Sequence, residues 1–220
     1  KFGTFTAVEN ITESFEAGEL ICIIGPNGAG KSTLLNMICG TLPVSDGTIT
    51  FAGDAINGRA PEDIARLGIA RKFQVPSVFE SLSVLDNIRL AAPAGTSAAT
   101  LDVLLDKIHL GSDRNVAGAD LPHGKKQWLE IGMALAMEPR VLLLDEPTAG
   151  LSVDETRDTA RFLKDLQGKV TVIVIEHDMA FVRELGARTI VMHHGSIIAA
   201  GPFHEIETDE TVRNVYLGRG

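Results

Sequence analysis

Long apolar runs are missing from this sequence. Hydrophobic residues make up 45% of its 220 residues, but largely apolar runs such as Val141–Leu144 and Val170–Ile175 have only the length of strands. Because a membrane-spanning helix needs about 20 consecutive apolar residues, the sequence predicts no such helix. The first residues show no signal-peptide pattern, and a start at Lys1 rather than at methionine leaves the natural beginning of the protein open.

Positive charge is also scarce. The 20 Lys and Arg residues are outnumbered by 29 Asp and Glu residues, which gives a net charge of −9. A protein that binds nucleic acid needs a stripe of Lys and Arg against the phosphate backbone. The densest basic segments here are the pairs Lys125–Lys126 and Arg71–Lys72, which we interpret as solvated surface. The composition therefore predicts no nucleic-acid partner.

Only two cysteines are present. Cys22 lies inside an apolar strand-sized run, and Cys39 lies near the end of an expected helix. Neither has the spacing of a metal ligand, so both are predicted to be buried, reduced thiols of a cytosolic protein.

Strand-sized apolar runs alternate with helical patterns along most of the chain, which predicts an α/β protein with a largely parallel sheet. From about residue 75 to 137 the pattern becomes helical, and Leu101, Leu104, Leu105 and Ile108 share one helical face. A loop rich in Ala, Pro, Gly and Ser is expected at Ala91–Ala99. The expected strands are Leu20–Ile24, Gly47–Phe51, Ile69–Phe73, Val141–Leu144, Val170–Glu176, Ala187–Met192 and Ile197–Ala200, and the expected helices are Lys31–Cys39, Pro61–Leu67, Val84–Leu90, Lys125–Met137, Val153–Leu166 and Met179–Leu185.

The segment Gly25–Thr33 matches the phosphate-loop pattern and stands between an expected strand and an expected helix. Its glycines let backbone N–H groups turn toward phosphate oxygens, and the helix N-terminus adds positive dipole. Lys31 is expected to reach the terminal phosphates, Ser32 to ligate Mg²⁺ and Thr33 to contact an inner phosphate. The loop predicts ATP and Mg²⁺ as ligands, although by itself it does not separate kinases, GTPases and ATPases.

Two carboxylates, Asp145 and Glu146, follow the apolar run Val141–Leu144. Ligands of open α/β sheets bind at this end of the strands. Because successive side chains on a strand point in opposite directions, Asp145 is placed to hold the Mg²⁺ shell and Glu146 to act as general base toward the attacking water. A lone Asp-Glu pair before a turn is common, and the phosphate loop is what favours this role.

Gln74 and His177 each follow an expected strand. The Gln74 amide is placed to reach Mg²⁺ or the water, whereas a lone glutamine in a loop is usually only solvated. The His177 imidazole is expected to contact the γ-phosphate and to hold the water with Glu146. A capping or surface histidine is the alternative for His177.

The segment Leu121–Gly124 precedes the expected helix Lys125–Met137. A glycine just before a helix offers free N–H groups to a phosphate. Because the chain already has one phosphate loop, this second helix start suggests contact with a nucleotide that another subunit holds.

In its motifs and their spacing the sequence resembles the ATP-binding subunits of ABC transporters over essentially its whole length. The resemblance implies a single domain over residues 1–220, with a P-loop NTPase core. The core and an N-terminal antiparallel β subdomain would comprise residues 1–74 and 138–220, and a helical subdomain would be inserted at about 75–137. The matching motifs are Walker A at Gly25–Thr33, the Q-loop glutamine Gln74, the signature at Leu121–Gly124 with Lys125, Walker B at Val141–Glu146, the D-loop at Ala149–Asp154 and the switch histidine His177.

This resemblance implies a membrane-associated ATPase that powers transport. Two such subunits, identical or paralogous, would sandwich ATP head to tail between Walker A and the partner's signature. Transmembrane permeases would dock near residues 74–85 and hold the subunit at the cytoplasmic face of the membrane. Phe2, with Phe5 as the fallback, would stack on adenine. The implied site residues are the catalytic Glu146, His177 and Gln74, the metal-binding Ser32, Gln74 and Asp145, and the nucleotide-binding Phe2, Gly25, Asn27, Gly28, Ala29, Gly30, Lys31, Ser32, Thr33, Leu121, His123 and Gly124.

A finer resemblance is to the branched-chain amino acid and urea branch of these subunits. It is carried by Ala65–Gln74, Pro76–Glu80, Gln127–Gly132 and Tyr216–Arg219, which are similar to the urea-type subunit in particular. The branch implies import of urea, short amides or branched-chain amino acids with a periplasmic or extracellular solute-binding protein. Other subunits select the solute, so the solute is inferred here only from the resemblance to this branch.

One residue departs from the family pattern. The signature usually carries a serine where this chain has Pro122, and that hydroxyl would contact the partner's γ-phosphate. His123 is a common variant in the branch, Lys125 replaces the usual polar residue, and Gly124 is retained. A proline suits the turn before a helix, so slower hydrolysis or weaker pairing is expected rather than a folding defect.

Three other functions compete with transport. Related ATPases in DNA repair or translation have two ATPase halves, a coiled-coil insertion or basic surfaces, and none of these is present. A phosphate-loop kinase would need an acceptor site and has no use for Leu121–Gly124. A regulatory nucleotide-binding module with little turnover draws support from Pro122, and an ATPase assay with and without membrane subunits would separate it from a transporter.

Overall fold

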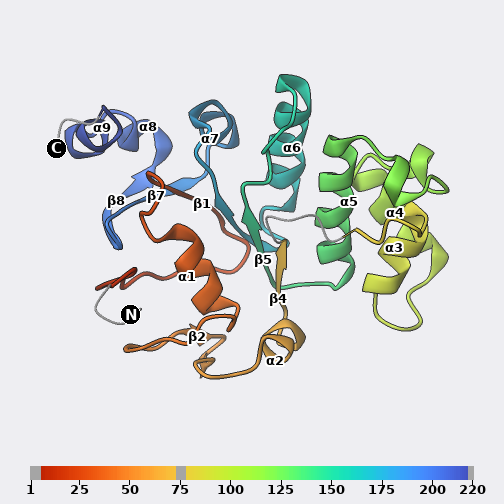
Figure 1. Cartoon of the computed structure of the whole chain (residues 1–220), viewed down its shortest axis with the longest axis horizontal. Coiled ribbons are helices and arrows are strands. Elements are labelled where there is room, and N and C mark those ends of the chain that lie inside the picture. The colour runs from red at the N-terminus through yellow and green to blue at the C-terminus, as the bar shows by residue number, and fades with distance from the viewer. Residues whose placement is uncertain (1–5, 73–77, 218–220) are drawn as a thin grey trace.

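The computed structural model describes residues 6–72 and 78–217 of the chain. Within them the main sheet has six strands in the order β4-β5-β6-β1-β7-β8, and every neighbouring pair is parallel except β7 and β8. A second, two-stranded antiparallel sheet joins β2 and β3 (Figure 1). The strands are β1 Leu20–Ile24, β2 Thr50–Phe51, β3 Asp54–Ala55, β4 Ile69–Lys72, β5 Val141–Asp145, β6 Thr171–Ile175, β7 Arg188–His193 and β8 Ser196–Pro202.

Helices cover both faces of the main sheet. Alternation along β1 shows why: Ile21 and Ile23 pack in one cluster with Leu35 of α1, whereas Cys22 and Ile24 pack in the other cluster with α5, α6 and α7. A parallel sheet with both faces buried matches the α/β expectation. The helices are α1 Lys31–Ile38, α2 Pro61–Arg66, α3 Val84–Ala91, α4 Ala98–Lys107, α5 His123–Ala136, α6 Val153–Leu166, α7 Met179–Leu185, α8 Phe203–Ile206 and α9 Glu210–Leu217.

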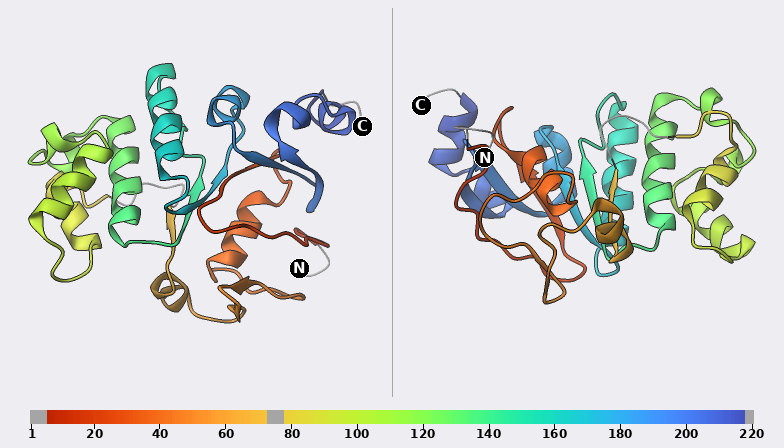
Figure 2. Two further views of the ribbon diagram at one scale, coloured as in Figure 1. Left: turned by 180° about the vertical axis from the view of Figure 1, so that it is seen from behind. Right: turned by 60° about the horizontal axis from the view of Figure 1, so that its bottom comes forward.

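Three helices, α3, α4 and α5, separate β4 from β5 in the sequence and pack on one another. Figures 1 and 2 show them grouped at one end of the molecule, away from both termini. Leu101, Leu105 and the C-cap residue Ile108 are buried and Leu104 packs partly buried against the same cluster, so the expected apolar face is confirmed. Among the described residues no helix is long and apolar enough to cross a membrane.

The expected strand Gly47–Phe51 is shorter in the structure, where only Thr50–Phe51 forms β2. The side chain of Asn57 substitutes for a strand partner: its Oδ1 accepts from the Ile49 N–H at 2.7 Å, and its Nδ2 donates to the Gly47 carbonyl at 3.1 Å. Gly47 also has a φ of 85°, which takes the backbone out of the extended region.

Two helices begin earlier than expected. Helix α4 starts at Ala98, inside the expected loop Ala91–Ala99, because the Ser97 hydroxyl caps it by accepting from the Thr100 N–H at 3.1 Å. Helix α5 starts at His123, with an extended Pro122 as its N-cap residue.

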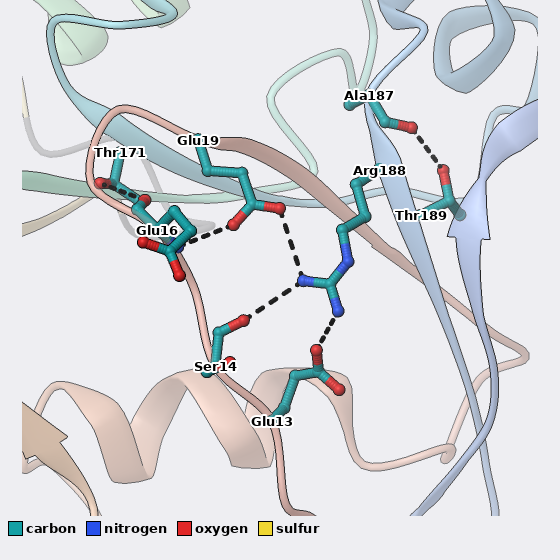
Figure 3. A network of polar contacts seen from close by, with 8 residues as sticks. All are labelled: Glu13, Ser14, Glu16, Glu19, Thr171, Ala187, Arg188 and Thr189. Carbon is teal, nitrogen blue, oxygen red and sulfur yellow. Dashed lines mark hydrogen bonds and ion pairs between the residues drawn. The ribbon is translucent and has the colours of Figure 1, made fainter.

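Arg188, at the start of β7, joins the segment before β1 to the main sheet (Figure 3). Its Nη1 donates to the Ser14 carbonyl at 3.3 Å and to Glu19 Oε1 at 3.4 Å, and its Nη2 donates to Glu13 Oε1. Hydrogen bonding to Glu13 raises the pKa of the Arg188 guanidinium. One cation therefore holds two carboxylates and a carbonyl of residues 13–19 beside β7.

Replacing Arg188 with alanine is expected to destabilise the fold by about 1–2 kcal/mol, because Glu13 and Glu19 would face each other without their cation. The loss should shrink as salt screens the two carboxylates. Urea unfolding at low and high salt measures both effects. Arg161→Ala, which removes an exposed pair with Asp158, is the control and should change stability far less. Equal losses in the two variants would contradict the role of the network.

Candidate functional site

Three neighbouring strands, β1, β5 and β6, end side by side at one edge of the sheet. Ile175 is the register partner of both Ile23 and Asp145. The pairing continues beyond the strands, where the Glu146 N–H donates to the Ile175 carbonyl at 3.0 Å and the Glu176 N–H donates to the Ile23 carbonyl at 3.2 Å. Because all three strands are parallel, the phosphate loop, the Asp145–Glu146 pair and His177 follow strand ends on the same edge.

The phosphate loop folds around the side chain of Lys31. Lys31 is buried, and its Nζ donates to the Gly25 carbonyl at 2.7 Å and to the Pro26 carbonyl at 3.1 Å. A Cβ on Gly25 would lie 2.1 Å from the Met192 carbonyl oxygen, and one on Gly30 would lie 2.5 Å from the Ala7 carbonyl oxygen. Both glycines also have positive φ, so the loop requires them on two independent grounds.

The loop and the start of α1 present backbone N–H groups without internal acceptors. No residue in the described part of the chain accepts a hydrogen bond from the N–H of Gly28, Gly30, Lys31 or Ser32. The first turn of α1 has no acidic residue, and its N-cap residue Gly30 has no side chain to cap it. Unpaired N–H groups at a positive helix end fit a phosphate group.

Burial and the two carboxylates act on the charge of Lys31 in opposite directions. Burial lowers the pKa of Lys31, while Glu146 and then Asp145 raise it. Asp145 is buried, whereas the Glu146 side chain is one-quarter exposed at 25%. The inner carboxylate is thus screened from solvent, and the outer one is open to a ligand and to water.

Glu146 and His177 meet at this edge. His177 Nδ1 lies 3.5 Å from Glu146 Oε1, and the His177 side chain is 63% exposed. Glu146 has a φ of 48°, a left-handed conformation that is strained for a residue with a Cβ, and it precedes Pro147. Strain of this kind is characteristic of functional positions.

The donor set at the edge fits Mg²⁺ only in part. Ser32 is exposed on the first turn of α1, and Asp145 ends β5. Within residues 6–72 and 78–217, no group of three His, Cys, Asp or Glu side chains is arranged to hold a metal ion. Mg²⁺ is commonly held by one or two protein oxygens together with phosphate oxygens and waters, so these residues suit a Mg²⁺ ion that arrives with a nucleotide.

Glu176 belongs to this site, and the sequence reasoning missed it. It is fully buried, and its Oε1 accepts from the Thr148 N–H at 3.1 Å and from the Thr148 hydroxyl at 2.6 Å. Its Oε2 accepts from the His177 N–H at 3.1 Å. The carboxylate therefore ties the turn after Glu146 to the backbone of His177. A glutamate directly after a buried strand and before His177 is the signal that was overlooked.

Glu176→Gln is expected to lower both stability and turnover. One amide oxygen cannot accept from Thr148 and from the His177 N–H together, and an unsatisfied buried donor costs about 1–3 kcal/mol. In a chain of this size, Tm should fall by roughly 2–4 °C for each kcal/mol. Thermal melts and steady-state kinetics measure the two effects. The control is Glu184→Gln on an exposed position of α7, and a Glu176→Gln variant as stable and active as this control would contradict the assignment.

The segment Leu121–Gly124 lies elsewhere. Leu121 is buried, His123 Nε2 lies 3.1 Å from the Ala149 carbonyl oxygen, and a Cβ on Gly124 would lie 2.2 Å from Glu155 Oε1. These contacts link the start of α5 to the D-loop and to α6, on the face of the sheet opposite α1. In the described residues no polar contact joins the segment to the phosphate loop.

Three residues predicted for the site are not among the described residues, and the prediction for Arg71–Lys72 was wrong. Phe2, Phe5 and Gln74 lie outside the described residues. The Arg71–Lys72 pair is not solvated surface, because both side chains are buried in ion pairs. An acidic partner lies on each side of β4, which the sequence alone did not show.

A family model described as ABC transporter matches residues 8–149, well over half of the chain. The chain belongs to the ABC transporter family. It is therefore an ATP-binding subunit of a transporter and an ATPase, with ATP and ADP as ligands. The predicted family and fold class are confirmed.

Relatives of this ABC ATPase act in more than one transport system. It is 32% identical to the high-affinity branched-chain amino acid transport ATP-binding protein LivG of Salmonella typhimurium, over 99% of this chain and 94% of that protein. It is also 32% identical to the lipopolysaccharide export system ATP-binding protein LptB of Acidithiobacillus ferridurans, over 96% and 90%. A solved structure of the ADP conformation of MJ1267, an ATP-binding cassette of an ABC transporter, has a TM-score of 0.86 at 29% identity and covers 99% of this chain and 94% of that one.

Proposed function

We propose that this ABC ATPase works as a head-to-tail dimer, with each ATP held between Gly25–Thr33 of one subunit and Leu121–Gly124 of the other. The observation that carries the proposal is that the chain has two helix starts suited to phosphate, on helices that cover opposite faces of the sheet. One nucleotide would touch both only if the second came from another subunit. Residues 75–137 would form the helical subdomain that presents the signature, and residues 1–74 and 138–220 the core and β subdomain.

Within this dimer the residues at the sheet edge would divide the chemistry. Lys31 and the N–H groups of α1 bind the phosphates, and Ser32 and Asp145 hold Mg²⁺, which neutralises phosphate charge when bound. Glu146 accepts the proton of the attacking water, and His177, whose Nδ1 lies 3.5 Å from Glu146 Oε1, contacts the γ-phosphate and holds that water with Glu146. Gln74 would complete the metal and water contacts, and Phe2 would stack on adenine.

The proposed cargo is urea, a short amide or a branched-chain amino acid, taken up with a periplasmic or extracellular solute-binding protein. Support comes from the branched-chain amino acid relatives at 30–32% identity. The subunit would lie at the cytoplasmic face, held by permeases. Lipopolysaccharide export is the second candidate, because the LptB protein is also 32% identical to this chain.

Reconstitution separates these cargoes. The chain would be combined in liposomes with permease and solute-binding proteins from the same organism, and ATP hydrolysis would be measured with each solute. We expect stimulation by one of the small solutes. Stimulation by lipopolysaccharide alone would support export instead, and hydrolysis that no permease changes would contradict coupling to transport.

Pro122→Ser is expected to speed hydrolysis or to strengthen ATP-driven pairing. Pro122 is the N-cap residue of α5 and offers no side-chain cap, whereas a serine hydroxyl would cap the helix or contact the partner's γ-phosphate. Turnover and the ATP dependence of dimerisation measure the two effects. Pro202→Ser, at the N-cap of α8, is the matched control. No change in rate or pairing on Pro122→Ser would show that this residue does not limit the site.

A further inference from the structure

Two buried ion pairs meet back to back at the end of β4. Arg71 Nη2 lies 3.0 Å from Asp145 Oδ2, with side chains only 7% and 4% exposed. Lys72 Nζ lies 3.4 Å from Glu130 Oε2, with side chains 3% and 4% exposed. Because Arg71 and Lys72 are neighbours on a strand, their side chains point to opposite faces of the sheet.

The Arg71 pair belongs to the phosphate-loop face. Arg71 Nη1 also donates to Asn36 Oδ1 of α1. One guanidinium therefore joins β4 to the helix that follows the phosphate loop and to Asp145, the carboxylate placed to hold Mg²⁺. Arginine suits this position because its planar fork binds two acceptors in fixed directions.

The Lys72 pair belongs to the other face. Glu130 lies in the middle of α5, the helix whose start carries Leu121–Gly124, and α5 packs against β4. A buried charge that loses its partner is strongly destabilising, so Lys72 and Glu130 must move together. A displacement of the end of β4 is thereby passed to α5.

A displacement of β4 would break few backbone hydrogen bonds. β4 is an edge strand, hydrogen-bonded only to β5 among the strands of the described residues. Its last two residues carry both pairs, so a change in either acidic partner acts on one short piece of backbone. No other strand of the described sheet has buried ion pairs on both faces.

We propose that Arg71–Lys72 is a two-sided ionic clamp through which the nucleotide site positions the signature helix α5. The roles of Asp145 and of the start of α5 rest on the proposed function. Arg71 and Lys72 are positioning residues: neither needs to touch the nucleotide, and each fixes a group that does. The clamp acts within one subunit and needs no dimer.

The test is hydrogen exchange with Mg-ADP, which the loop Gly25–Thr33 of a single subunit is proposed to hold. In the wild-type chain, Mg-ADP is expected to change amide exchange both in α1 and in α5. In Lys72→Met/Glu130→Leu, which replaces the buried ion pair with apolar side chains, the α1 response should remain and the α5 response should be lost. The Kd of Mg-ADP should stay within about twofold. Asp158→Asn/Arg161→Gln, which removes an exposed pair on α6, should keep both responses.

Two further variants test whether the Lys72–Glu130 pair forms in solution and whether the Arg71 guanidinium is required. Glu130→Leu alone leaves Lys72 buried without its anion and should have a lower Tm than the double variant, which would confirm that the pair is intact in solution. Arg71→Lys keeps the charge but loses the fork, and should weaken the α5 response while the α1 response persists. An α5 response that survives in the double variant, or that is absent in the wild type, would overturn the clamp. A failure of dimerisation alone would overturn the proposed function and leave these results unchanged.

Discussion

Glu146→Gln is expected to lower ATP turnover by about a hundredfold or more while ATP still binds, because removing a general base typically costs at least that factor. The glutamine amide keeps the size of the side chain but cannot accept a proton from water. Glu146 is the partly exposed carboxylate of the pair at the end of β5, 3.5 Å from His177 and held in a strained conformation. Asp145, by contrast, is buried beside Arg71.

The same variant should hold two subunits together in the presence of Mg-ATP, since a dimer that opens on hydrolysis would stay closed. Single-turnover kinetics measures the chemical step, and light scattering with and without Mg-ATP measures the dimer. Glu184→Gln provides a control of identical chemistry on the exposed face of α7. A Glu146→Gln variant that hydrolyses ATP normally would remove this residue from the general-base role.

Lys31→Met should weaken ATP binding about ten- to a hundredfold. Hydrogen bonds to charged groups are worth about 1.5–3 kcal/mol, and each 1.4 kcal/mol changes Kd about tenfold. The effect should be large because Lys31 is buried at the loop that offers the free N–H groups, with only the Gly25 and Pro26 carbonyls as hydrogen-bond partners in the described structure. Methionine fills the space of the lysine stem without its charge.

Calorimetry with ATP measures this loss, and a thermal melt without nucleotide tests whether the loop is still folded. Lys164→Met, on an exposed position of α6, removes the same charge elsewhere and should leave Kd unchanged. If Lys31→Met bound ATP as tightly as the control, the phosphates would have to be held by backbone N–H groups alone.

Much of the fold follows from local patterns in the sequence. The core strands are short apolar runs that must be buried on both faces, and their alternating side chains supply both apolar clusters. Helix starts were harder to place, because single side chains decide them. The cap at Ser97 starts α4 inside a segment whose composition indicates a loop.

The candidate site likewise contains residues that the sequence predicts and residues that it does not. Gly25–Thr33 was predicted from its phosphate-loop pattern, and Asp145, Glu146 and His177 were predicted because they follow expected strands, whose parallel ends meet at one edge. These residues could be found because each belongs to a short motif or follows an apolar strand in the sequence. Partners that come from distant parts of the chain leave no such pattern.

The sequence by itself determined the family, the phosphate loop and the acidic strand end, because glycines with positive φ and carboxylates at a strand terminus are local requirements. Only the tertiary structure decided the state of the charges at β4 and β6. Arg71–Lys72 has the composition of a solvated pair, yet Asp145 and Glu130 lie within 3.0 and 3.4 Å of it. Glu176 is likewise buried against Thr148. Whether a charge is solvated or paired depends on residues 28 to 74 positions away, and folding alone brings these together.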